Sequence, residues 1–234
     1  KKIGHTGTLD PMATGVLVLC IGSSLMLVES MMNHYKEYIA TILLGIETDT
    51  LDITGEVQRE VVPQNITKER VVEVLKKFQG KIKQEVPKYS AIKVGGKKLY
   101  EYAREGIEVS LPVHEVEISQ IELVGDVLNT PFQIHVAVSK GTYIRSLVRD
   151  IGYALGTVAV MTDLVRTRVG KFLIEDAFSI SDIKAGSYAL LDPREVLDLP
   201  VIMVDDFLLK KIKNGFVLHS FFSYDMVFIE NSNH

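Results

Sequence analysis

The chain has 234 residues, of which 47% are hydrophobic and 24% are charged, a composition that excludes disordered and collagen-like chains. Its one cysteine, Cys20, excludes an internal disulfide and a cysteine zinc cluster, and no apolar run reaches the roughly 20 residues of a membrane helix. The net charge of −4, taken alone, argues against a nucleic-acid partner. We therefore expect a cytoplasmic, globular chain with one large domain and a small appendage.

The charge is unevenly distributed along the chain. Residues 81–104 hold seven basic and two acidic side chains, and residues 140–171 hold six basic and two acidic ones. Residues 172–206 hold eight acidic and two basic side chains. Two basic segments on an acidic chain are typical of a surface that binds a phosphate backbone, although solvated helix faces give the same pattern.

The first part of the chain predicts two strands separated by a helix. The apolar run 15–21 predicts a buried strand, and residues 23–32 predict a helix capped by one of the two serines at its start. Alternation over residues 35–44 predicts a half-buried strand. The polar stretch 47–55 then predicts a loop rich in turns.

The middle of the chain predicts helices and long strands. Thr67 is a suitable N-cap for an amphipathic helix whose apolar residues recur at helical spacing: Val71, Val74, Leu75 and Phe78. Residues 97–104 predict a short helix. Alternation over residues 107–124 and 132–138 predicts two strands, and Phe132, Ile134, Val136 and Val138 share one face of the second.

A second amphipathic helix is expected over residues 142–155, followed by strands around 165–172. Many strands and few helices, without regular βαβ alternation, predict an α+β fold with a mixed or antiparallel central sheet.

Pro200 is the expected domain boundary, because the acidic stretch before it is interrupted by glycine and proline. Residues 1–200 are then the main domain, and residues 201–234 an appendage with a helix over 205–213 and two short strands within 215–229.

An unusual loop precedes the first apolar run. The segment GHTGTLDPMATG, residues 4–15, combines three glycines with His5 and Asp10. Glycines let the backbone approach a ligand, and Pro11 restricts Asp10 to an extended conformation, so the segment is typical of a functional loop. A phosphate-binding P-loop is excluded, because no lysine precedes a hydroxyl residue here. A plain turn, with His5 as an ordinary loop side chain, is the alternative.

A second candidate is SKGTYIR, residues 139–145, where a strand turns into a helix. Arg145 lies in the first turn of that helix, where it is suited to pair with a carboxylate or a phosphate, unless it is an ordinary surface arginine. Tyr38, near the start of strand 35–44, either stacks on a planar base or packs in the core.

Five ordered segments resemble the TruB family of tRNA pseudouridine synthases, bacterial enzymes that convert uridine 55 of the tRNA T-loop to pseudouridine. They are GHTGTLDPMATGVL, KEY, KYSAIKVGGKKLYEYAREGIEV, SKGTYIRSL and LVRTRVGKF, and the resemblance runs from Lys1 to about Asp206. Family members carry a block resembling KPxGxTS before the first segment, so an N-terminal truncation is expected. The family also commonly has a histidine near Val160 and an arginine near Val165, where this chain is apolar.

The resemblance implies a role for each candidate residue. Asp10 is the catalytic carboxylate, Tyr38 the ring that stacks on the target uracil, Arg145 the partner of Asp10, and His5 a residue that helps keep the T-loop flipped out. The two basic segments are expected to line the RNA groove, with contacts at Lys88, Tyr89, Lys97, Lys98, Tyr143, Arg166 and Arg168. The implied fold is an α+β pseudouridine synthase domain followed by an RNA-binding PUA-type domain, of which residues 201–234 are the start.

The implied reaction isomerises a uridine without redox change, so no organic cofactor and no metal are expected. The expected partner is the T-loop and T-stem of tRNA, bound by a monomer with no obligate protein partner and no membrane. Three alternatives remain: a non-catalytic RNA-binding protein on the same scaffold, the catalytic subunit of a guide-RNA-dependent pseudouridylation complex, and a glycosidase that pairs Asp10 with Asp49 or Asp52. The glycosidase is disfavoured, because an arginine beside Asp10 opposes the raised pKa that such an acid needs.

Overall fold

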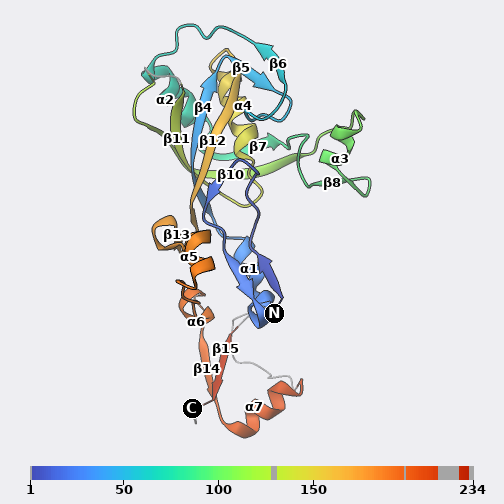
Figure 1. Cartoon of the computed structure of the whole chain (residues 1–234), viewed down its shortest axis with the longest axis vertical. Helices are drawn as coiled ribbons and strands as arrows, with labels where there is room; N and C mark the ends of the chain where they lie inside the picture. Colours follow the sequence, from blue (N-terminus) through green and yellow to red (C-terminus); the bar gives the residue numbers. More distant parts are fainter. Residues whose placement is uncertain (1, 128–130, 198, 216–226, 232–234) are drawn as a thin grey trace. The chain divides into compact units, whose positions relative to one another are not determined.

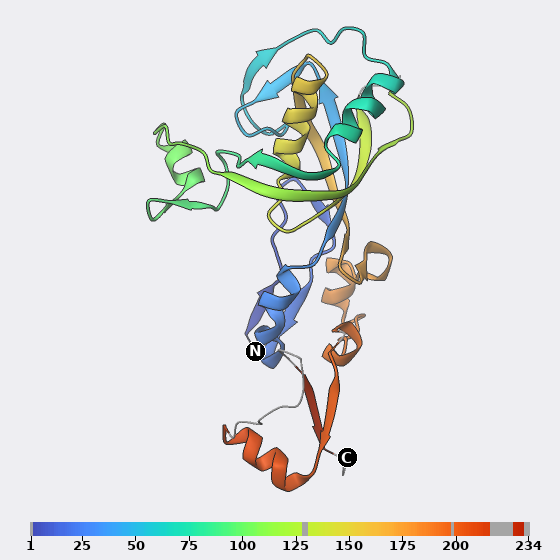
Figure 2. The same cartoon turned by 180° about the vertical axis from the view of Figure 1, so that it is seen from behind.

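The computed structural model describes residues 2–127, 131–197, 199–215 and 227–231, and the chain forms two compact units, Lys1–Ala177 and Phe178–His234 (Figures 1 and 2). The boundary expected at Pro200 falls within the second unit. The interpretation of residues 201–234 as the start of a PUA-type module stays a prediction.

A seven-stranded sheet forms the centre of the first unit. Six strands lie in the order β13-β12-β4-β11-β10-β7, and β2 pairs with β12. Among the described strands of this sheet, β2–β12 is the one parallel pair, so the sheet is mixed and the expected α+β fold is confirmed. The strands are Thr14–Gly15 (β2), Lys36–Leu44 (β4), Gly80–Glu85 (β7), Val113–Val124 (β10), Phe132–Val138 (β11), Ala159–Val169 (β12) and Phe172–Leu173 (β13).

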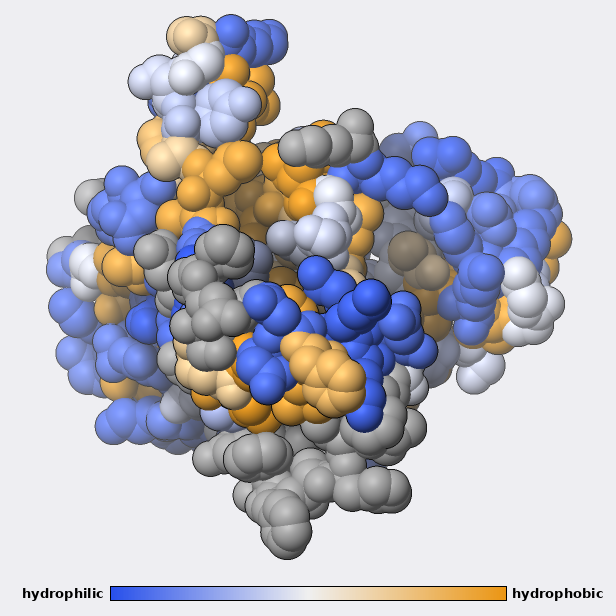
Figure 3. All heavy atoms as spheres, turned by 90° about the horizontal axis from the view of Figure 1, so that it is seen from below, coloured by the Kyte–Doolittle hydropathy of each residue, from blue (hydrophilic) through white to orange (hydrophobic). Residues whose placement is uncertain are grey.

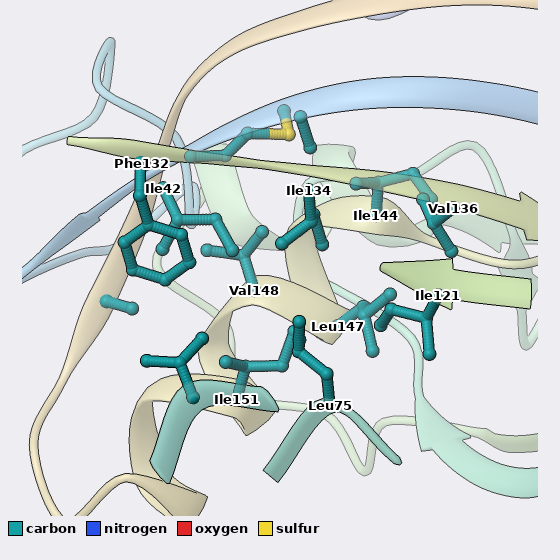
Figure 4. Packing of buried hydrophobic residues seen from close by; sticks show 14 of the residues in the cluster. Ile42, Leu75, Ile121, Phe132, Ile134, Val136, Ile144, Leu147, Val148 and Ile151 are labelled. Atoms are coloured by element: carbon teal, nitrogen blue, oxygen red, sulfur yellow. The ribbon is translucent and has the colours of Figure 1, made fainter. Parts of the chain in front are cut away.

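The middle strands follow the alternation that predicts them. Every second residue of β4 is buried, from Lys36 to Leu44. In β11 the four residues expected on one face, Phe132, Ile134, Val136 and Val138, are all buried. Figure 4 shows the β11 side chains directed at Leu147, Val148 and Ile151 of α4 and at Leu75 of α2. Burial of these apolar side chains is the main force that holds the helices on the sheet.

Two helices cover this face, and both agree with the predicted pattern. α2 spans Lys68–Lys77, and the Thr67 side chain accepts a hydrogen bond from the Arg70 amide at 3.3 Å, which caps the first turn. α4 spans Ile144–Ala154 and ends before Gly156, whose φ of 76° few residues other than glycine adopt.

The predicted buried strand over residues 15–21 is wrong. The chain forms β2 and then a separate β3, Leu19–Ile21, which pairs with β1, Ile3–His5. Leu17 and Leu19 are 44% and 48% exposed. Gly15 turns the chain at a φ of 105°, so the two strands have different partners, which an apolar run cannot reveal.

The predicted helix over 23–32 is a 3₁₀ turn, Gly22–Leu27, followed by α1, Val28–Met32. Neither serine caps it, because the N-cap position is Ile21 and no side chain bonds to the turn there.

Two hairpins extend from the sheet. β5 (Ile46–Thr48) and β6 (Val57–Glu60) pair after β4. Residues 86–112 form what we call the arm, which projects to one side of the sheet and carries β8 (Lys93–Val94), β9 (Lys97–Lys98) and α3 (Leu99–Arg104) (Figure 1). Figure 3 shows that the face of the arm seen from below is largely hydrophilic. The strand expected from residue 107 begins only at Val113, because Pro112 has no amide hydrogen to continue the ladder.

The second unit holds α5 (Ile180–Ala185), α6 (Pro193–Val196), β14 (Val201–Val204), α7 (Asp206–Lys213) and β15 (Phe228–Asn231). The helix predicted over 205–213 is confirmed, with Asp205 accepting from the Leu208 amide as its cap. Of the two strands expected within 215–229, β15 begins at Phe228, and residues 216–226 lie outside the described residues. In the described part of the chain, no helix is long and apolar enough to span a bilayer.

Candidate active site

A tight loop between β1 and β2 presents Asp10. The Thr6 amide donates to Val18 O, and the Ala13 amide donates to Asp10 O at 2.9 Å, which closes a turn around the acid. At the end of the loop, a Cβ on Gly15 would lie 2.1 Å from Arg166 O. Gly15 therefore allows the loop to approach β12 directly.

Arg145 holds Asp10 in a two-point ion pair. Its Nε donates to Oδ2 at 2.9 Å and its Nη2 donates to Oδ1 at 3.1 Å. The Arg145 side chain is 6% exposed and that of Asp10 33%, so the carboxylate is oriented from behind and open to solvent in front. Such a fork-to-fork pair fixes both the position and the plane of the carboxylate. The structure thus brings together the two residues that the resemblance pairs.

The remaining Arg145 donors bind two other loops. Nη1 donates to Thr50 O at 2.9 Å and Nη2 also donates to Tyr89 O at 3.0 Å. The buried carboxylate of Asp52 lies 3.8 Å from Nη1 and adds a second negative charge beside the guanidinium. Sequence reasoning considered Asp52 only as a partner of Asp10, and it missed this contact with Arg145. Its place in the polar stretch 47–55, which follows a predicted strand, was the available signal.

Tyr38 lies on β4 next to Arg166 of β12, to which it is paired in register. The side chain is 9% exposed. Burial raises the pKa of Tyr38, the nearby Arg166 charge opposes that rise, and the Asp10 charge adds to it. The phenol is therefore neutral at physiological pH. Arg166 also donates to the carbonyls of Gly7 and Thr8, in the loop that carries Asp10, so it links the Tyr38 strand to that loop.

Two further expected site residues, Tyr143 and His5, lie directly before α4 and at the end of β1. The Tyr143 amide donates to Gln84 Oε1 at 2.8 Å, and burial raises the pKa of the half-buried phenol. His5 is exposed at the end of β1, and its Nδ1 accepts from the Gly7 amide at 3.3 Å.

Four of the expected RNA contacts lie on the arm. Lys88 is exposed, and Tyr89 donates through its hydroxyl to Asp49 Oδ2 at 2.8 Å. Lys97 forms an ion pair with Glu105, and Lys98 lies 5.4 Å from the centre of the Tyr100 ring. Lys88 is exposed and the Lys97 side chain is 33% exposed, so both are accessible to a partner.

The two arginines on β12 differ. Arg168 is 45% exposed and pairs with Glu37 at 3.3 Å. Arg166 is 2% exposed, and its guanidinium donates to three loop carbonyls, Val16 O at 2.7 Å, Gly7 O at 3.0 Å and Thr8 O at 3.4 Å. This burial disagrees with the RNA contact expected at Arg166, because its donors point at the protein's own backbone. Sequence alone does not distinguish the two positions.

No group of three or more His, Cys, Asp or Glu side chains among the described residues is arranged to hold a metal ion.

Comparison with known proteins identifies the family. The profile of the TruB family pseudouridylate synthase N-terminal domain matches residues 1–144, and that of the tRNA pseudouridylate synthase B C-terminal domain matches residues 145–207. The chain belongs to the TruB family.

Individual TruB relatives are similar over most of the chain. A protein named tRNA pseudouridine synthase B from Clostridium tetani is 43% identical over 219 residues, which are 92% of this chain and 75% of that protein. One of the same name from Bacillus subtilis is 40% identical over 232 residues, 94% of this chain and 75% of that protein. The resemblance inferred from the motifs is thereby confirmed.

Solved structures share the fold. The chain matches one in a Cbf5-Nop10-Gar1 complex with a TM-score of 0.63 and 25% identity, covering 92% of this chain and 59% of that one. A chain of an H/ACA RNP bound to a substrate RNA containing 2'-deoxyuridine matches with a TM-score of 0.64 and 23% identity, covering 99% and 66%. The chain thus spans less than two thirds of these solved chains, and the second match supports the fold alone.

Proposed function

We propose that this protein isomerises uridine 55 in the T-loop of tRNA to pseudouridine, with Asp10 as the nucleophile. The observation that carries the proposal is the two-point pair between Arg145 and Asp10 inside a loop that belongs to the TruB family match. The relatives named tRNA pseudouridine synthase B support tRNA as the substrate.

The reaction breaks the N1–C1′ bond of the uridine, rotates the uracil and forms a C5–C1′ bond. The C5 proton is released to solvent and N1 takes up a proton from solvent, so the product has the same atoms as the uridine. The Asp10 carboxylate attacks either C6 of the ring or C1′ of the ribose, and it is regenerated at the end. Each carboxylate oxygen has a second lone pair, so Asp10 can react while Arg145 still holds it. Because uridine and pseudouridine are isomers at the same oxidation level, the reaction needs no oxidant or reductant.

The target base is stacked inside the T-loop and must be extruded before Asp10 can reach it. Extrusion costs a few kcal/mol, which stacking on a ring and contacts between basic side chains and phosphate offset. We assign the ring to Tyr38 and the phosphate contacts to the arm, with Lys88, Lys97 and Lys98, and to Arg168 on β12. His5 and Tyr143 lie at the rim of the same site in this proposal, and residues 201–234 begin a PUA-type module that contacts the acceptor stem.

Tritium release from a tRNA transcript labelled at C5 of uridine tests the proposal. We expect release from the parent, none from Asp10→Asn, and none from a transcript with cytidine at position 55. Asp10→Asn should still bind tRNA, which separates loss of chemistry from loss of folding. Release that persists in Asp10→Asn would remove the assigned nucleophile, and binding without release by the parent would favour a non-catalytic RNA-binding protein.

A guide-dependent complex is the second candidate, because a 25% identical solved chain lies in a Cbf5-Nop10-Gar1 complex. The same assay on free tRNA, with no guide RNA and no other protein, distinguishes the two. We expect turnover under these conditions and a monomer in light scattering. Turnover that appears only when a guide and partner proteins are added would favour the complex.

A further inference from the structure

Arg166 is a buried cation whose side chain forms hydrogen bonds with the loop that carries Asp10. Its three hydrogen bonds reach both sides of that loop: Gly7 O and Thr8 O before Asp10, and Val16 O after it. Burying a charge costs free energy unless the charge is hydrogen-bonded, and the planar guanidinium spreads five N–H donors over three nitrogens, so it can bond to acceptors that lie apart.

The backbone of Arg166 binds the same loop. The Val16 amide donates to Arg166 O at 2.8 Å, and Gly15 is paired with Arg166 in the parallel β2–β12 register. On its other edge, β12 pairs Arg166 with Tyr38 of β4. A single residue therefore contacts both the loop that presents Asp10 and the strand that presents Tyr38.

We propose that Arg166 is a positioning residue that sets the separation between the Asp10 carboxylate and the Tyr38 ring. It acts through the loop and does not touch the substrate. The role differs from that of Arg145, which orients the carboxylate itself. The inference rests on the proposed function, since it concerns the alignment of a nucleophile with a base stacked on Tyr38.

Arg166→Lys is the informative substitution. Lysine keeps the positive charge and most of the length, but its single nitrogen cannot bond to carbonyls on both sides of the loop in the fork geometry. A misplacement of about 1 Å at a reacting group costs on the order of 100-fold in rate. We therefore expect the variant to fold and to bind tRNA, with a nucleophile that is poorly aligned.

Arg70→Lys is the matched control. Arg70 donates to Leu155 O at 2.8 Å and to Asn65 O at 3.2 Å, so it too is an arginine that holds backbone carbonyls. Its bond to Leu155 lies at the end of α4 opposite Arg145. The control therefore measures how much activity is lost when an arginine that binds backbone carbonyls away from the site is replaced by lysine.

Two readouts decide the proposal. The first compares single-turnover tritium release with the tRNA Kd. For Arg166→Lys we expect a rate about 10- to 100-fold lower, with a Kd within about twofold of the parent. For Arg70→Lys we expect the parental rate. An Arg166→Lys rate equal to that of the parent, or a Kd that weakens as much as the rate falls, would overturn the positioning role.

The second readout is hydrogen exchange of the amides over residues 7–16, which needs no activity. We expect faster exchange there in Arg166→Lys and parental exchange in Arg70→Lys. Unchanged exchange rates would contradict the claim that the Arg166 hydrogen bonds stabilise this loop. A parent without turnover, whose loop is nevertheless loosened by Arg166→Lys, would show that the proposed function fails while the loop contact stands.

Discussion

The Tyr89 hydroxyl donates to Asp49 Oδ2 at 2.8 Å, and this bond joins the arm to the turn after β5. Arg145 donates to a carbonyl on each side of the junction, at Tyr89 and at Thr50. The guanidinium that orients Asp10 is thus held by two loops that are bonded to each other. We therefore expect that a displacement of the arm also shifts Arg145 and, with it, the Asp10 carboxylate.

Tyr89→Phe removes the junction and keeps the ring, so any stacking by residue 89 is retained. We expect kcat/KM for tRNA to fall about 3- to 10-fold, as for one partly exposed hydrogen bond. Tyr102→Phe is the control, because its hydroxyl bonds to Val94 O within the arm. Steady-state kinetics on both variants measure the difference, and equal losses would mean that the arm matters only as a unit.

Arg145→Lys tests orientation of the nucleophile. The lysine nitrogen cannot reproduce the two-point contact with Asp10 while also reaching the carbonyls of Thr50 and Tyr89. We expect the single-turnover rate to fall about 100-fold or more, with the tRNA Kd within about threefold. Arg70→Lys again controls for the loss of an arginine fork. A variant that loses affinity and rate in parallel would point to a phosphate contact at Arg145 instead.

The sequence predicts the elements whose pattern is local. Alternation predicts β4 and β11, and helical spacing together with a capping threonine predicts α2, because burial and hydrogen bonding within a few residues decide those elements. The single strand predicted over residues 15–21 is wrong, because the two ends of this run pair with different strands. β2 pairs with β12, and β3 pairs with β1.

The candidate site likewise contains some residues that the sequence predicts and some contacts that it does not. Asp10, Tyr38 and Arg145 are expected from the family resemblance, and the structure brings Asp10 and Arg145 into contact across 135 residues. Two features escape sequence reasoning, the burial of Arg166 against a loop about 150 residues away and the position of Asp52 behind Arg145. Nothing near Arg166 in the sequence distinguishes it from the exposed Arg168, because its partners are backbone atoms without residue-specific signals.

Gly15→Ala tests the approach of the loop to β12. A Cβ at this position would lie 2.1 Å from Arg166 O, on a backbone with a φ of 105°. We expect the free energy of unfolding to fall by about 2–4 kcal/mol, from strain and steric clash together. Gly22→Ala is the control, because Gly22 also has a positive φ but has open space around its Cβ, and it should cost about 1 kcal/mol. Urea unfolding of both variants gives the comparison, and equal costs would mean that the close approach is unimportant.

Alkaline stability depends on the buried phenol of Tyr38. Burial raises the pKa of Tyr38, so the folded chain holds that proton to a higher pH than the unfolded chain does. Between the two pKa values the folded state binds more protons, and the free energy of unfolding therefore falls as pH rises above about 10. The stabilisation is fully present below that pH.

Thermal unfolding between pH 8 and 11 measures this dependence. Tyr38→Phe should decline less steeply with pH than the parent, whereas Tyr188→Phe, at an exposed position, should follow the parent. Because phenylalanine keeps the buried ring and removes only the ionisable group, a change in slope reports the phenol itself. Parallel slopes for the parent and Tyr38→Phe would mean that other groups dominate the alkaline transition. Tyr89 and Tyr143, whose phenols also have a raised pKa, are among these groups.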